Sequence, residues 1–111
     1  GPFPFAIEAV HCDVASMTTR YRTRHGAVVD QQGPLVDGLP RVADFDRDAV
    51  IAAIRRDQRG ESTYPEFMVD IWHAGVIAYD IDLVSRTCTY LGLDPDIDVH
   101  VEDYPAVTLD D

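Results

Sequence analysis

Residues 64–92, YPEFMVDIWHAGVIAYDIDLVSRTCTYLG, constrain the fold most, because they combine signals for a helix, a turn and a β-hairpin. Thr63 and Glu66 have the spacing of a capping box, which predicts a helix beginning at residue 64. Gly75 predicts the end of that helix. The alternation of apolar and polar residues that follows is typical of strands with one buried face, and it predicts a hairpin with strands at 76–82 and 87–91.

The rest of the chain gives weaker signals of the same kinds. Acidic residues precede the apolar face of residues 46–59 and arginines follow it, which predicts a second secure helix. The other predicted elements, in chain order, are the last part of a helix at 3–11, strands at 15–24 and 27–30, a loop at 31–41, a strand at 97–102 and a short edge strand at 107–109. A chain of 111 residues is expected to form one domain. The sequence therefore predicts a single α+β domain over residues 1–111, with two or three helices packed on a mainly antiparallel sheet.

A shift of the chain by 62 residues aligns several similar positions. Phe5 meets Phe67, and His11 meets His73. The matches indicate either a duplication, which predicts two α-β-β halves, or a chance similarity.

The net charge of −11 is concentrated in the second half of the chain. Residues 1–60 carry eight acids and eight arginines, whereas residues 61–111 carry twelve acids and one arginine. Phosphate binding needs clustered cations, so the acidic half is not expected to contact nucleic acid. The charge permits a basic protein or a cation as partner, and the simpler interpretation is a solvated acidic surface. A small molecule is the other partner expected for this chain.

Two cysteines and the absence of long apolar runs indicate a reduced, cytoplasmic protein without a membrane span. Neither Cys12 nor Cys88 lies in a C-x-x-C motif. Cys88 is predicted to be a buried structural thiol. A single disulfide between the two cysteines is the alternative.

Six short motifs point to a family. In chain order they are DQRG at 57–60, YPEF at 64–67, AGV at 74–76, YDID at 79–82, RTCTYLG at 86–92 and EDYPAV at 102–107. Together they make residues 45–107 resemble the YbcV-like domain of small bacterial and phage-associated proteins of unknown function, often labelled phage envelope proteins. The resemblance implies a roughly α+β fold and supplies no catalytic or binding residues.

The favoured function is a non-enzymatic binding or interaction module. The chain has no nucleophile elbow, phosphate-binding loop or dinucleotide fingerprint. Alternation along the C-terminal strands predicts an acidic sheet face as the recognition surface, formed by Asp80, Asp82, Asp98, His100 and Glu102. Asp70 and His73 share the polar stripe of the helix that begins at residue 64, and they complete the set of candidate binding residues.

The alternative function is an enzyme that binds a small molecule or metal through His11, His73 and neighbouring carboxylates. Glu8 precedes His11 by three residues, as Asp70 precedes His73. In a helix this spacing puts both side chains on one face, and di-metal carboxylate bundles use it for their ligands. The simpler interpretation is a histidine at each helix end, where the dipole favours its charged form. The sequence predicts no cofactor and assigns no metal ligand.

A third hypothesis for the function is an accessory protein of a phage or mobile element.

Overall fold

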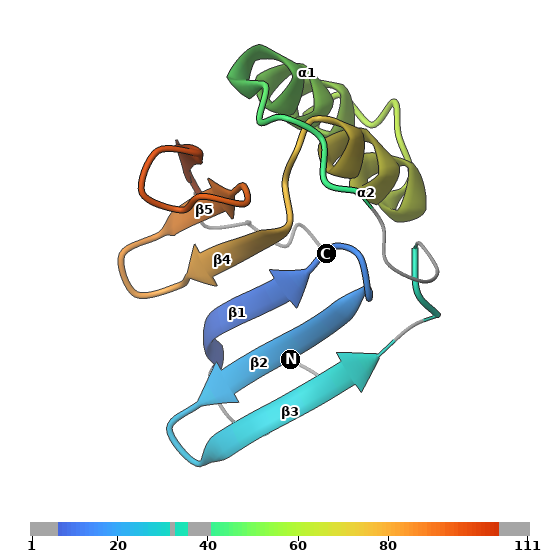
Figure 1. The fold of residues 1–111 in the computed structure, drawn as a ribbon. Coiled ribbons are helices and arrows are strands. Elements are labelled where there is room, and N and C mark those ends of the chain that lie inside the picture. Colours follow the sequence, from blue (N-terminus) through green and yellow to red (C-terminus); the bar gives the residue numbers. More distant parts are fainter. Residues whose placement is uncertain (1–6, 32, 36–40, 105–111) are drawn as a thin grey trace.

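The computed structural model describes residues 7–31, 33–35 and 41–104, and its main element is a six-stranded antiparallel sheet (Figure 1). The strand order is β3-β2-β1-β4-β5-β6. The strands are β1 (Ile7–Asp13), β2 (Thr18–Thr23), β3 (Gly26–Gln31), β4 (Ala78–Asp82), β5 (Thr87–Leu91) and β6 (Val99–Asp103). The two helices are α1 (Arg47–Gln58) and α2 (Tyr64–His73).

The first described strand, β1, lies inside the sheet between β2 and β4. His11 pairs with Arg20 on β2 and with Asp80 on β4. The predicted helix end at residues 3–11 is therefore wrong for the described residues 7–11. The prediction depended on the apolar content of a short run, and backbone pairing with two neighbouring strands outweighs so weak a local preference.

The predicted fold class, α+β with two or three helices and duplicated α-β-β halves, is also wrong. Strands hold 37% of the described residues and helices 24%, and two helices accompany a single sheet. Residues 7–13 form a strand, whereas the positions aligned with them by the 62-residue shift begin inside α2. The described chain therefore runs β-β-β and then α-α-β-β-β.

Both helices begin at the caps that the sequence predicts. The Asp46 side chain accepts a hydrogen bond from the Ala49 amide at 3.1 Å, at the start of α1. At the start of α2, the Thr63 side chain accepts from the Glu66 amide and the Glu66 side chain accepts from the Thr63 amide. These bonds satisfy amides that a helix leaves without internal partners. The predicted helices at 46–59 and 64–74 are thus confirmed to within one residue at each end.

Side chains from α2 pack on one face of the sheet, and Figure 1 shows both helices on the same side of it. Phe67 meets the Tyr90 ring of β5 edge-on, with ring centroids 6.5 Å apart. The Tyr64 hydroxyl lies 3.3 Å from that of Tyr79 on β4. The largest fully buried side chains are Met68, Ile71, Val14, Val50, Val76 and Cys12. The core therefore lies between the helices and this face of the sheet.

The structure also bears on the predicted C-terminal strands, the cysteines and a membrane span. The strand at 87–91 has the predicted bounds, and the strand predicted at 97–102 begins two residues later as β6. The edge strand predicted at 107–109 lies outside the described residues. Cys12 and Cys88 are both buried free thiols, so the disulfide alternative is wrong. Neither described helix is long and apolar enough to cross a membrane.

Candidate functional site

Charged side chains gather on the sheet face opposite the helices. Side chains alternate along a strand, so the strand neighbours of the buried Cys12 and Tyr79 point away from α2. No described helix packs on that face. We call it the open face. On the neighbouring strands β2, β1 and β4 it includes Ala9, His11 and Asp13 on β1, Arg20 and Arg22 on β2, and Asp80 and Asp82 on β4.

The strand register puts arginines on one side of the open face and aspartates on the other. One row across the strands reads Arg22, Ala9, Asp82, and the next reads Arg20, His11, Asp80. Adjacent strands are separated by about 4.8 Å, so arginine and aspartate backbones in one row lie about 10 Å apart. Long arginine side chains span much of that distance.

His11 lies between two carboxylates. Its Nδ1 is 2.5 Å from Asp80 Oδ1, and its Nε2 is 3.2 Å from Asp13 Oδ1. Partial burial lowers the pKa of His11, but hydrogen bonds and charge from Asp80 and Asp13 outweigh burial and raise the pKa above its usual value. An imidazolium donates from both nitrogens. The charged form therefore satisfies both carboxylates at once.

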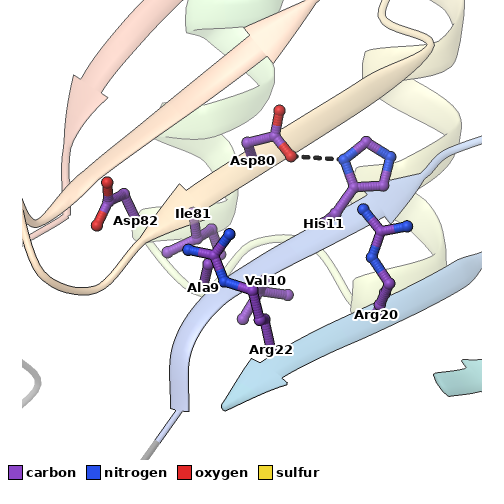
Figure 2. Close-up of a pocket in the computed structure, with 8 residues that line it drawn as sticks. All are labelled: Ala9, Val10, His11, Arg20, Arg22, Asp80, Ile81 and Asp82. Carbon is purple, nitrogen blue, oxygen red and sulfur yellow. Dashed lines mark hydrogen bonds and ion pairs between the residues drawn. The ribbon is translucent and has the colours of Figure 1, made fainter. Parts of the chain in front are cut away.

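A pocket of about 230 Å³ opens on this face. Figure 2 shows Arg20, Arg22 and His11 around it, with Asp80 and Asp82 on the strand beyond. The small side chain of Ala9 contributes to its floor. Both arginines are exposed, and neither forms a hydrogen bond or ion pair with another described residue. Their donors are available to a ligand.

Asp82 lies at the end of β4, where the hairpin turn holds it. Its Oδ1 accepts hydrogen bonds from the amides of Val84 and Ser85 at 2.9 and 3.1 Å. These bonds lower the pKa of Asp82, and the positive charge of Arg22 lowers it further. The carboxylate is therefore fixed in position and negatively charged near neutral pH.

The structure divides the predicted acidic sheet face between two sides of the sheet. Asp80 and Asp82 lie on the open face, whereas His100 and Glu102 lie on the helix side. Glu102 accepts two hydrogen bonds from Arg55 of α1, at 2.8 and 3.1 Å, and lies 2.6 Å from His100 Nε2. The bond from Arg55 is the main cause of the lowered pKa of Glu102, and His100 adds to it. Asp98 lies in the turn before β6, where it accepts a hydrogen bond from the Asp94 amide.

The other two candidate residues lie on α2. Arg56 of α1 donates to Asp70 at 2.8 Å and lies 3.6 Å from Glu66, so Asp70 joins the two helices. His73 is exposed and lines a separate pocket of about 350 Å³ with Asp70 and Arg56. His11 does not line that pocket.

The two acid-x-x-His steps do not form equivalent sites. Glu8 and His11 lie on a strand whose pairing with β2 is irregular between Ile7 and Ala9, whereas Asp70 and His73 lie on a helix. Within the ranges that the structure describes, no three histidine, cysteine or acidic side chains come together as a group able to hold a metal ion.

Sequence reasoning missed Arg20, Arg22 and Asp13. The signal for the arginines was present, because they stand two apart in a predicted strand and must share one face. Their position opposite Asp80 and Asp82 depends on β1 lying between β2 and β4, which no local pattern shows.

Two mycobacterial proteins are similar to this chain over most of its length. An uncharacterized protein of Mycobacterium tuberculosis (strain H37Rv) is 45% identical over 92 residues, which cover 83% of this chain and 55% of the relative. An uncharacterized protein of Mycobacterium bovis matches to the same extent. The chain thus spans about half the length of these curated relatives. The resemblance to YbcV-like, phage-associated domains stays a prediction. The family described as "Protein of unknown function (DUF1398)" matches residues 6–103, and the chain belongs to this family.

Proposed function

We propose that this chain is a non-enzymatic binding module and that the open face of its sheet is the recognition surface. The observation that carries the proposal is the pair Arg20 and Arg22, exposed beside a pocket and without a hydrogen-bonding partner among the described residues. Each guanidinium presents five N–H donors in a rigid fork that matches anionic groups. Asp80 and Asp82 add negative charge across the same pocket. The surface suits a partner that carries groups of both signs.

The state of His11 supports binding more than catalysis. A general base needs a ring nitrogen that can reach a substrate proton. Both ring nitrogens of His11 already face carboxylates, and the raised pKa favours the imidazolium, which has no free lone pair. The alternative of an enzyme that uses His11 and His73 together gains no support, because the two line different pockets.

Of the candidate binding residues predicted from the sequence, two belong to the proposed surface and three have structural contacts instead. Asp80 and Asp82 remain in the recognition surface. Glu102 and His100 connect β6 to α1 through Arg55. Asp70 connects the two helices through Arg56.

NMR of the ¹⁵N-labelled chain in bacterial cell extract tests the proposal. The extract is divided by filtration into small molecules and macromolecules, and each fraction is added separately. We expect amide shifts concentrated at residues 9–13, 20–22 and 80–82, with the amides of α1 little changed. The variant Arg20→Gln/Arg22→Gln should abolish these shifts.

The matched control is Arg47→Gln/Arg59→Gln, which makes the same change in net charge at the two ends of α1. It should retain the shifts. Amide shifts on the helix side as large as those on the open face would contradict the proposed surface. So would open-face shifts that persist when Arg20 and Arg22 are replaced.

A further inference from the structure

We infer that the pocket on the open face binds a small zwitterion, a molecule with one carboxylate and one ammonium group, of which a free α-amino acid is the simplest case. The inference rests on the proposed function, because it names the class of ligand for the same surface. Four observations support it: the size of the pocket, the two arginines, the two aspartates, and a charged histidine whose charge neighbouring carboxylates balance.

The pocket has the size for a small metabolite. Its volume of about 230 Å³ is below the range of roughly 300–1,000 Å³ that is usual for drug-sized ligands. Ala9 stands where the neighbouring row has His11, and its single methyl group leaves the space open. A molecule of several heavy atoms fits, whereas a long extended chain does not fit within it.

Arg20 and Arg22 form the cationic side. They are two apart on β2, so they share a face and their backbones are about 7 Å apart along the strand. Two guanidinium forks at that separation converge on a carboxylate, which accepts hydrogen bonds at both oxygens. No described residue occupies these donors.

Asp80 and Asp82 form the anionic side. Each uses its Oδ1 within the protein, Asp80 toward His11 and Asp82 toward the turn amides of residues 84 and 85. Each carboxylate keeps a second oxygen, Oδ2, that accepts none of these hydrogen bonds. An ammonium group has three donors and no acceptor, so it suits two such oxygens.

The charge of His11 does not change this balance. The imidazolium lies between Asp80 and Asp13 and is largely compensated by them. A simple carboxylate would gain from the arginines but be repelled by the aspartates, and a simple amine would experience the reverse. A zwitterion with its carboxylate toward β2 and its ammonium toward β4 gains from both sides.

Binding of single amino acids measured by NMR tests the inference. The twenty amino acids are added in small pools to the ¹⁵N-labelled chain, and the best one is compared with its deaminated acid and its decarboxylated amine. We expect saturable shifts at residues 9–11, 20–22 and 80–82 with at least one amino acid. Each analogue should bind at least about tenfold more weakly, since each lacks one charge-assisted contact. Arg20→Gln/Arg22→Gln and Asp82→Asn should each weaken binding by about tenfold or more, whereas Arg47→Gln/Arg59→Gln should not.

Each contrary result has a defined meaning. If the deaminated acid binds as tightly as the amino acid, the inference of a zwitterionic ligand is overturned. The same holds if cell extract shifts open-face amides but no amino acid does. In both cases the open face remains a binding surface. If neither extract nor amino acid moves open-face amides, the inference and the proposed function both fail.

Discussion

Substitution of Gly75 tests how tightly the turn between α2 and β4 is packed. Gly75 has φ of +92°, a backbone conformation that side chains disfavour. A Cβ atom there would lie 2.7 Å from Asp44 O, 2.7 Å from Phe45 Cα and 2.8 Å from Ala43 O. These are backbone atoms that cannot rotate away. Gly75→Ala therefore combines backbone strain with a steric clash.

Gly60→Ala provides the matched control, because it isolates the strain. Gly60 has φ of +73° at the end of α1, and nothing lies within 4 Å of the position that a Cβ atom would take there. The left-handed conformation costs an alanine about 1–2 kcal/mol at either glycine. Overpacking adds about 1–3 kcal/mol at Gly75 alone. The expected total is about 2–5 kcal/mol for Gly75→Ala, a large share of the roughly 5–15 kcal/mol of a typical domain.

Urea unfolding followed by circular dichroism measures both variants. The free energy of unfolding should fall further for Gly75→Ala than for Gly60→Ala, by about 1–3 kcal/mol. If the two losses agree within about 0.5 kcal/mol, the close approach of residues 43–45 to the turn is refuted. If Gly75→Ala does not fold while Gly60→Ala does, the packing argument holds.

Three further changes test electrostatics and burial. Asp80→Asn should lower the pKa of His11, measured by NMR titration of its ring, because it removes the nearer carboxylate. The raised pKa of His11 means that its stabilisation is present below about pH 6.5 and lost as pH rises through the folded-state value. Because Asp13 still faces His11 in this variant, urea unfolding should show a smaller loss of this kind than in the unaltered protein. Glu102→Gln should destabilise the protein near pH 7, and by less as the pH falls below 4.5. The reason is that Arg55 lowers the pKa of Glu102. The stabilisation by Glu102 is therefore present above its usual pKa of 4.5 and lost as pH falls through the folded-state value. A loss of stability that does not change with pH would contradict the ion pair. Cys88 is buried, which raises its pKa to about 11, so a thiol reagent should modify it in urea and not in the native protein, as read by mass spectrometry.

Local signals were enough to predict both helices and the second hairpin. The capping box at Thr63 and Glu66 and the acidic cap of α1 act within a few residues, so the sequence shows them directly. The strand at 87–91 follows from its alternation. These elements supply most of the buried core residues, and the two helices cover one face of the sheet.

The structure of residues 7–13 could not be predicted in this way, because distant residues determine it. The alternation of Ala9, His11 and Asp13 was present, but the run is short and its apolar content also fits a helix end. Its identity as a strand comes from pairing with β4, where His11 meets Asp80, 69 residues away. The candidate site shares this origin, since the same pairing brings the two arginines opposite the two aspartates.

The pairing of β1 with β4 also bears on how the chain folds and unfolds. The β2–β3 and β4–β5 hairpins close short loops, whereas β1 and β4 must meet across most of the described chain. Contacts between such distant residues are slow to form, because ordering the intervening chain costs entropy first. A ligand held between Arg22 and Asp82 would span three strands, β2, β1 and β4, and so would stabilise the pairing of β1 with β4. A ligand bound there would therefore raise the free energy of unfolding.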